Sequence, residues 1–376
     1  MGIPAEKYYP QLDSLRAIAV LLVMFSHFLA GGPWGDYGVR LFFVLSGFLI
    51  TSIILSHKEK MTITGASTLL VAKNFYIRRS LRLFPVYYLA LTAYLVLALM
   101  TGTETGGIAN DAAYHYLYLT NILVFVRGEW LGPLSPYWSL AVEEQFYIAW
   151  FWIVLLAPAI RFPLIVVAVI VSAPIFRLAM YLSGNNHYAD VLLPACMDTL
   201  AAGALLSVLT HTAYAKHFVP LRDYLAAHRG HLELGVALSA LLLLMSSFGL
   251  DKENLIRRLL TNTLSSIVFV YVVYRCYCGI GGKLGAVLSN TLLITIGRFS
   301  YGVYVYHMLV LYILRENLLI QSHVADWLSG YSVLEKVLNF LIPTLITLGV
   351  AYLSWQYIEK PFLLLKERYS EGLGSI

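Results

Sequence analysis

The sequence contains little charge and few cysteines. Only 12% of its 376 residues are Asp, Glu, Lys or Arg, whereas soluble globular proteins average about 25%, and 59% are hydrophobic. These proportions exclude a soluble globular protein, and they exclude intrinsic disorder, which needs abundant charge and few apolar residues. The three cysteines, Cys196, Cys276 and Cys278, lie in apolar segments without histidine partners at a metal-ligand spacing, so they predict neither a disulfide framework nor a metal site.

Long apolar runs fill the sequence instead. A helix needs about 20 mostly apolar residues to cross a hydrocarbon core of about 30 Å. Residues 112–126, which include Tyr114, His115, Tyr116 and Tyr118, suit an interfacial or re-entrant helix better than a crossing. The sequence therefore predicts an all-α polytopic membrane protein, a bundle of about ten transmembrane helices. The ten expected spans are 13–30, 38–56, 82–101, 138–158, 162–182, 190–210, 231–249, 261–278, 291–314 and 337–358.

The distribution of basic residues predicts the orientation of this bundle. With ten spans and an inside N-terminus, 16 Lys and Arg residues fall on inner loops and inner span ends and 7 on outer ones; Arg16, Arg177 and Arg298 lie within spans, which accounts for all 26. The positive-inside rule favours this arrangement, so we expect both termini in the cytoplasm and a multi-pass protein of the cell membrane. The same asymmetry explains the net charge of +5 better than nucleic acid binding does.

Ionisable residues inside the spans are the functional candidates, because a charged side chain at the bilayer centre costs at least about 2.5 to 3.5 kcal/mol. In the first span, Arg16 and His27 are eleven residues apart, which on an ideal α-helix leaves them within about 20° of alignment and about 16 Å apart along the axis. The pair indicates the two ends of a polar path through the membrane. The alternative is that Arg16 snorkels to the inner headgroups and His27 marks the outer boundary.

The fourth span begins with two adjacent carboxylates, Glu143 and Glu144, which point about 100° apart on a helix and cannot share one environment. We expect Glu143 to face the interior. We expect Glu144 to lie in the outer headgroup region, with Trp138 and Tyr147 as aromatic-belt anchors, a position that remains the alternative for Glu143.

Three further spans carry polar candidates. Arg79 and Arg82 are one turn apart at the inner end of the third span, where guanidinium groups hold either the phosphates of a ligand or anionic lipid. In the ninth span, Ser300, Tyr304 and His307 lie within about 60° on a helical wheel and form a polar stripe. Two weaker candidates remain: Asp198 is expected to pair with a buried arginine such as Arg177, and Glu359 to cap or anchor the end of the tenth span.

Together these residues resemble the membrane-bound acyltransferase-3 family over essentially the whole chain. Any one of its motifs is weak, but six occur here in the family's order. They are Arg16 and His27 with ten residues between them; Phe43–Ile50; Arg79 and Arg82 with Pro85; Trp138–Leu140 with Glu143, Gln145, Phe146 and Tyr147; Ser300–Tyr304 with His307; and Glu359–Pro361.

The resemblance implies a ten-span O-acyltransferase that depends on acyl-coenzyme A (acyl-CoA) and acts on bacterial surface sugars. Some members carry a soluble hydrolase-like domain outside the membrane. We expect none here, so residues 1–376 would form a single transmembrane domain that passes the acyl group to the acceptor itself or to a separate partner.

The expected mechanism uses a cytosolic donor and an external acceptor. Acetyl-CoA is the expected donor and a carbohydrate or lipid-linked glycan hydroxyl the acceptor, without a resident cofactor or metal. His27 would take the hydroxyl proton, or form an acyl-histidine, while Glu143 orients its imidazole. The predicted catalytic residues are His27, Glu143 and His307; the donor-binding residues are Arg16, Arg79 and Arg82; the substrate-binding residues are Asp13, Ser139, Ser300 and Tyr304. The competing function is a transporter or flippase that uses the same residues as an intramembrane relay.

Overall fold

The computed structural model describes residues 8–101, 108–211, 227–249, 254–316 and 332–368, and these residues form helices without any β-strand. Nine helical segments in them are long and apolar enough to cross a membrane. The protein is therefore an all-α, multi-pass membrane protein. The nine segments are Pro10–Leu29, Trp34–Thr64, Thr68–Met100, Gly132–Leu156, Phe162–Leu182, Leu193–Thr210, Arg229–Gly249, Leu255–Cys278 and Lys336–Leu365.

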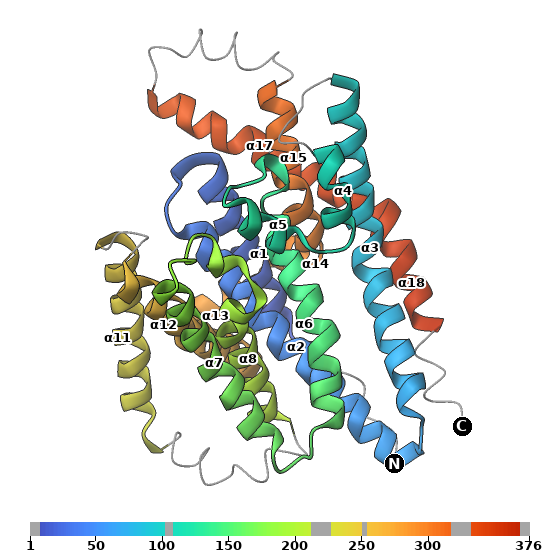
Figure 1. Cartoon of the computed structure of the whole chain (residues 1–376), viewed down its shortest axis with the longest axis vertical. Helices are drawn as coiled ribbons and strands as arrows, with labels where there is room; N and C mark the ends of the chain where they lie inside the picture. The colour runs from blue at the N-terminus through green and yellow to red at the C-terminus, as the bar shows by residue number, and fades with distance from the viewer. Residues whose placement is uncertain (1–7, 102–107, 212–226, 250–253, 317–331, 369–376) are drawn as a thin grey trace.

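Figure 1 shows how the helices are arranged. The long ones are α1 (Pro10–Phe25), α2 (Trp34–Thr64), α3 (Thr68–Thr101), α6 (Tyr137–Leu156), α7 (Phe162–Leu182), α8 (Leu193–Thr210), α11 (Arg229–Gly249), α12 (Leu255–Cys278) and α17 (Ser332–Ser354). The shorter ones are α4 (Ile108–Tyr116), α5 (Thr120–Arg127), α13 (Gly282–Leu288), α14 (Thr291–Arg298), α15 (Ser300–Glu316) and α18 (Lys360–Arg368), with the 3₁₀ turns η2 (Gly132–Leu134) and η3 (Ala189–Val191). Helices α3 and α18 run side by side along one edge of the bundle, and α11 stands at the opposite edge.

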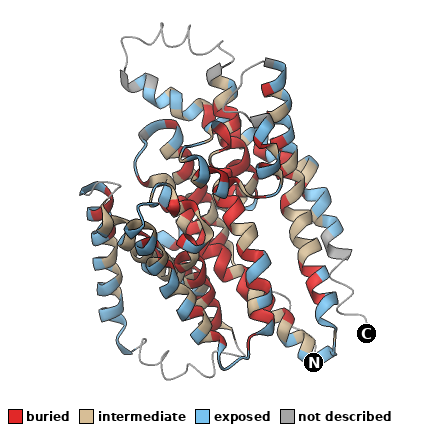
Figure 2. Cartoon of the chain, in the orientation of Figure 1, coloured by how far each residue is buried: buried red, intermediate tan, exposed pale blue. Residues whose placement is uncertain are grey.

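The packing is that of a membrane protein rather than a soluble one. Buried residues gather along the central helices, whereas α11 is exposed along most of its length (Figure 2). Large apolar side chains such as Leu234, Leu238, Leu241 and Met245 are more than half exposed on α11. A soluble protein rarely leaves such a continuous apolar face open, and here it is the face that lipid tails would contact.

The centre of the bundle depends on a close contact between α2 and α8. A Cβ atom on Gly203 would lie 2.1 Å from the carbonyl oxygen of Val44, and one on Gly47 would lie 1.9 Å from that of Leu200. The two backbones can approach this closely because both residues lack a side chain, as is common where membrane helices pack. This contact fixes α2 in place, and α2 carries part of the wall of the candidate active site.

The ninth expected span is wrong as a continuous helix. Residues 291–314 form two helices, α14 and α15, which meet at Phe299 with backbone angles φ −106° and ψ 17°. At the break, Gly297 lies against the first span so closely that a Cβ would be 1.9 Å from the carbonyl oxygen of Asp13, and Ser300 Oγ donates to the Gly297 carbonyl at 2.8 Å. The apolar run predicts the length of the span 291–314 correctly, but it does not reveal the contact with the first span that accompanies the break.

Residues 112–126 do not cross the membrane as one helix. They belong to α4 and α5, of nine and eight residues, which are separate and each too short to span the hydrocarbon core. Asp111 of α4 forms an ion pair with Arg127 of α5, which ties the two together. This confirms the interpretation of the segment as a non-crossing element.

Two spans contain a π-helical turn next to a motif residue. The turn η1 (Ser26–Ala30) follows α1 and contains His27, and the turn η5 (Trp355–Glu359) follows α17 and ends at Glu359. Such turns are rare and concentrate at functional sites. Because η1 lies between Arg16 and the end of the span, the alignment calculated for an ideal α-helix does not apply to His27.

Candidate active site

One pocket collects most of the predicted site residues. Its empty volume, including the space at its mouth, is about 640 Å³. It is lined from α1, α2, α3, α6 and α15, so the surrounding helices come from both ends of the sequence. Seven of the ten predicted site residues line it, namely Arg16, Arg79, Arg82, Ser139, Glu143, Ser300 and Tyr304.

Three arginines give this pocket its charge. Arg16 comes from α1, while Arg79 and Arg82 come from successive turns of α3. Arg16 is 3.8 Å from Asp13 Oδ1, so its guanidinium faces the pocket with a carboxylate beside it. The structure thus favours the interior position of Arg16 over snorkelling to the headgroups.

Glu143 and Tyr147 form part of the pocket wall that α6 supplies. The Tyr147 hydroxyl donates to Glu143 Oε2 at 2.9 Å and also contacts Ser46 Oγ of α2. The guanidinium carbon of Arg79 lies 4.0 Å from the centroid of the Tyr147 ring, a cation–π contact. A single tyrosine therefore connects α2, α3 and α6 within the pocket.

Two of the aromatic-belt expectations for the fourth span are wrong. Tyr147 is only 1% exposed, so it is an interior residue. Glu144 Oε1 is also buried, which places this carboxylate inside the protein rather than in the headgroup region. A helical wheel could not show this, because α2, α5 and α8 pack against α6 and cover faces that the wheel treats as open.

His27 and His307 form a pair of their own. His27 Nδ1 is 2.9 Å from His307 Nε2, and the rings are stacked with centroids 5.1 Å apart. His307 Nδ1 is 2.5 Å from the carbonyl oxygen of Tyr304, which can only accept. In the neutral rings, His307 Nδ1 therefore carries the proton, His307 Nε2 accepts from His27 Nδ1–H, and His27 Nε2 keeps a free lone pair.

This pairing changes the expected role of Glu143. The hydrogen-bond partner of His27 is His307, whereas Glu143 is bonded to Tyr147. The residue positioned to orient the His27 imidazole is thus His307. His307 is fully buried, while His27 remains exposed on the side away from its partner.

Tyr304 connects the histidine pair to the pocket. Its ring lines the pocket and lies 5.5 Å, centroid to centroid, from the His307 ring. Its hydroxyl meets Ser139 Oγ at 2.5 Å and the Pro136 carbonyl at 3.0 Å, and Ser139 Oγ bonds to the same carbonyl. Neither histidine is among the residues that line the pocket. Tyr304 therefore lies between the pocket, which contains the three arginines, and the pair of histidines.

The remaining predicted substrate-binding residues, Asp13 and Ser300, lie near the arginines of the pocket. Asp13 accepts from the hydroxyl of Tyr8 at 2.7 Å, and Arg298 donates to the same hydroxyl at 3.1 Å. Asp13 is therefore part of the charged rim next to Arg16 rather than of the pocket wall. Ser300 lines the pocket, but its hydroxyl proton is committed to the Gly297 carbonyl, so it can offer substrate only acceptor lone pairs.

Sequence reasoning missed the contact between two residues of this region. Ser46 and Tyr147 lie within motifs, yet nothing local indicates that their hydroxyls meet across two helices. Glu359, which was expected to cap or anchor the end of the last span, has its side chain buried at 6% exposure against α15.

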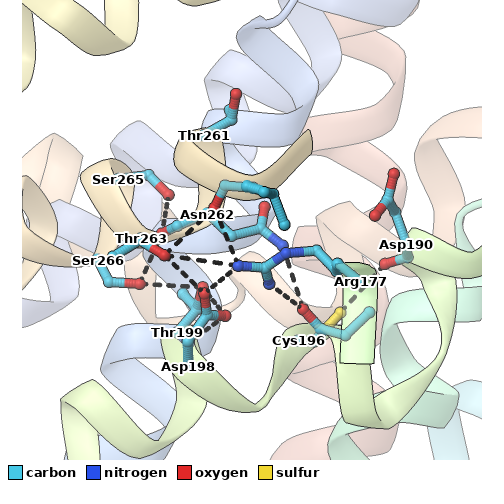
Figure 3. Close-up of polar contacts among 12 residues, drawn as sticks. Arg177, Asp190, Cys196, Asp198, Thr199, Thr261, Asn262, Thr263, Ser265 and Ser266 are labelled. Carbon is cyan, nitrogen blue, oxygen red and sulfur yellow. Dashed lines mark hydrogen bonds and ion pairs between the residues drawn. The ribbon is translucent and has the colours of Figure 1, made fainter. Parts of the chain in front are cut away.

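A second buried polar network is separate from the pocket. Arg177 of α7 forms an ion pair with Asp198 of α8 at 2.8 Å, and both side chains are 1% exposed (Figure 3). Arg177 also donates to the carbonyl oxygens of Ala195 at 2.6 Å and Leu259 at 3.2 Å, and Thr263 of α12 donates to Asp198. The predicted pairing of Asp198 with Arg177 is confirmed, and it ties three helices together.

Comparison with known proteins identifies the family. The family described as "Acyltransferase domain" matches residues 9–358. The chain therefore belongs to the acyltransferase-3 family of membrane proteins.

Curated relatives show the same relationship over most of the chain. It is 28% identical over 386 residues to "Putative peptidoglycan O-acetyltransferase YrhL" of Bacillus subtilis (strain 168), covering 95% of this chain and 55% of that protein. It is 29% identical over 384 residues to "Putative O-acetyltransferase SACOL0978" of Staphylococcus aureus (strain COL), covering 95% and 57%. Against "Peptidoglycan O-acetyltransferase OatA" of Listeria monocytogenes it is 36% identical over 155 residues, 39% of this chain and 24% of that protein. The chain thus spans about half the length of the first two relatives, and no solved structure matches it.

Proposed function

We propose that this protein is a membrane O-acetyltransferase that moves an acetyl group from acetyl-CoA on the cytosolic side to a hydroxyl of a cell-envelope glycan on the outer side. The single observation that carries the proposal is the convergence of Arg16, Arg79 and Arg82 in one pocket that reaches Tyr304, behind which lies the histidine pair. Family membership and the names of the relatives favour acyl transfer, and peptidoglycan is the acceptor that two of those names give.

The donor's charge explains why the arginines lie in a pocket. Coenzyme A carries several phosphate charges, which cannot enter hydrocarbon, while its thioester arm is slim and nearly neutral. Guanidinium groups bind phosphate oxygens in a bidentate manner, so Arg79 and Arg82 would hold the phosphates and Arg16 would line the way inward. Only the acyl arm would then need to pass Tyr304.

The chemical step would take place at His27. Its free Nε2 lone pair would accept the acceptor hydroxyl proton as the oxygen attacks the thioester carbonyl. The carbon–sulfur bond would then break, and the leaving thiolate of coenzyme A would take the proton back from the imidazolium. His307 would hold the reactive tautomer of His27 and stabilise the imidazolium that forms, with its own orientation fixed by the Tyr304 carbonyl. The acetyl ester and free coenzyme A are the products.

Labelled acetyl-CoA and a soluble peptidoglycan fragment, incubated with the purified protein, test the proposal. The expected result is labelled ester on the glycan and free coenzyme A in equal amounts. A transporter or flippase would leave the thioester intact, so glycan without label and unconsumed acetyl-CoA would contradict the proposal.

The donor site is tested by binding. Replacing Arg79 or Arg82 by Gln should raise the Kd for coenzyme A about tenfold to a hundredfold, because each change removes charge-assisted hydrogen bonds. Arg275→Gln is the matched control, since Arg275 lies on α12 and bonds Glu233 and Tyr271 outside the pocket. An unchanged Kd in both α3 variants would remove these arginines from the donor site.

A further inference from the structure

An aromatic ring holds the Arg79 guanidinium in the pocket. The guanidinium carbon lies 4.0 Å from the centroid of the Tyr147 ring, and both residues line the pocket. The Nε atom of Arg79 is buried and has no hydrogen-bond partner among the residues that the structure describes. Leaving a buried N–H group without an acceptor costs free energy, so an oxygen atom of a ligand would complete this side chain.

The hydroxyl of Tyr147 fixes the ring in this position. It donates to Glu143 Oε2 at 2.9 Å, one turn earlier on α6, and it also contacts Ser46 Oγ of α2. An ionised carboxylate can only accept and a phenol has a single proton, so Ser46 must be the donor in the second contact. Tyr147 is 1% exposed, and Ser46 is buried as well. The orientation of the ring is thus set from α2 and α6, and Arg79 of α3 packs on the ring that they fix.

Tyr147 also divides two opposite charges. Its hydroxyl bonds the Glu143 carboxylate, and its ring contacts the Arg79 guanidinium. A cation–π contact uses no hydrogen-bond acceptor, so it attracts the guanidinium while leaving the N–H groups for other oxygens. A carboxylate in direct contact would occupy those N–H groups and cancel the charge. The hydrogen bond to Glu143 also polarises the phenol, which makes its ring more attractive to a cation.

We propose that Tyr147 is a positioning residue of the donor site. Its ring holds the Arg79 guanidinium and its hydroxyl occupies the Glu143 carboxylate, so that the N–H groups of Arg79 stay available for phosphate oxygens. This proposal rests on the proposed function, because it takes Arg79 to be a ligand of the donor's phosphates. Tyr147 acts through Arg79 and Glu143 rather than on the phosphates themselves.

A double-mutant cycle on the full-length protein tests the role of the ring. Tyr147→Leu should raise the Kd of coenzyme A about threefold to tenfold, because the cation–π contact that positions Arg79 is lost. In the Arg79→Gln background the same change should alter the Kd by less than about twofold, because no guanidinium is left to position. A residue that only supports the fold would instead weaken binding by the same factor in both backgrounds.

Tyr147→Phe tests the role of the hydroxyl, and it serves if the Leu variant folds poorly, because it keeps the ring. It should raise the Kd of coenzyme A about twofold to fivefold, because the released Glu143 carboxylate pairs with Arg79 and occupies its N–H groups. Adding Glu143→Gln should reverse this rise, since a neutral amide does not form that ion pair.

Tyr271→Leu is the matched control. Tyr271 of α12 donates to Glu233 at 2.9 Å, and the guanidinium carbon of Arg275 lies 5.6 Å from its ring centroid, so the same three residue types meet there. None of these three residues lines the pocket. The Kd of coenzyme A should therefore stay unchanged in this variant, whereas a rise equal to that of Tyr147→Leu would overturn the proposal.

The remaining outcomes separate this proposal from the proposed function. If Arg79→Gln does not weaken coenzyme A binding, the donor site itself is wrong, and the role of Tyr147 is wrong with it. If Arg79→Gln weakens binding but Tyr147→Leu does not, or does so equally in both backgrounds, only the role of Tyr147 is wrong. A Tyr147→Phe variant that binds as tightly as the unmodified protein, or whose weaker binding Glu143→Gln does not reverse, would equally overturn that role.

Discussion

At the scale of single residues, the proposed chemistry depends on one imidazole whose proton positions are set by its neighbours. The Tyr304 carbonyl can accept but not donate, and that fixes the proton positions of His307 and then of His27. The sequence places the two histidines 280 residues apart, and only folding makes them partners.

The first prediction concerns this pair. His27→Ala should abolish acetyl transfer, a loss of at least about a hundredfold, because it removes the general base, while the Kd for coenzyme A stays unchanged. His307→Ala should lower turnover less, about tenfold, since His27 remains but loses its fixed tautomer. Transfer rates and Kd measured on the same folded preparations check both, and a His27→Ala protein with unimpaired transfer would refute the role of His27.

The second prediction concerns His115 on α4, outside the spans. Its ring is 1% exposed, its Nδ1 is 2.9 Å from Thr120 Oγ1, and burial lowers its pKa to about 4. Because this folded-state pKa lies below the unfolded value of about 6.5, the neutral ring contributes stability that is complete above pH 6.5 and is lost as the pH falls toward 4. The contribution is at most about 3 kcal/mol.

The measurement compares thermal unfolding of the unmodified protein and His115→Gln in detergent between pH 7 and pH 4. The variant should lose less stability over this interval than the unmodified protein. An equal loss in both would show that other groups account for the acid sensitivity.

At the scale of elements, the lengths of the apolar runs predicted most of the membrane-spanning helices. They did not predict where a helix breaks or changes to a π-helical turn. Nine expected spans correspond to long helices, whereas the segment 291–314 breaks at Phe299 and two spans end in π-helical turns. The hydrophobic pattern of a sequence indicates which residues face lipid or the protein core. It does not indicate where the backbone of a neighbouring helix interrupts a span. Gly297, whose backbone packs closely against Asp13, lies two residues before the break.

The third prediction tests the contact between α2 and α8. Gly203→Ala places a methyl group where the Val44 carbonyl oxygen is 2.1 Å away, so the helices must separate, at a cost of about 3 kcal/mol. Gly235→Ala on α11, where a Cβ meets nothing within 4 Å, should leave stability unchanged or raise it by about 0.5 to 1 kcal/mol. Unfolding temperatures of the two variants give the comparison, and similar values would contradict the close packing.

At the scale of the whole molecule, the chain has two polar centres with different tasks. The pocket is open to ligand and lined by three arginines, whereas the Arg177–Asp198 network is closed and its charges are paired. The closed network lies among α7, α8 and α12, and α8 in turn packs on α2 at the pocket wall. The pocket arginines are thus available to bind a ligand, whereas Arg177 and Asp198 stabilise the packing of the helices.

The fourth prediction separates these tasks. Asp198→Asn should destabilise the protein by about 3 to 5 kcal/mol, because it leaves Arg177 charged and unpaired in a dry interior. The double change Arg177→Met and Asp198→Leu should recover most of that stability, since apolar residues of similar size replace the pair. Unfolding temperatures measure both, and transfer activity of the recovered double variant should match that of the unmodified protein.

The sequence by itself determined that this chain is an α-helical membrane protein, which family it resembles and which residue types carry the chemistry, because membrane spans and ionisable residues within them are local features. Only the tertiary structure decided that His307 rather than Glu143 partners His27, that Tyr147 connects Ser46, Glu143 and Arg79, and that Glu359 lies buried against α15. The reason is physical: each of these contacts joins different helices, and the side-chain spacing within one helix does not determine which neighbour will pack against it.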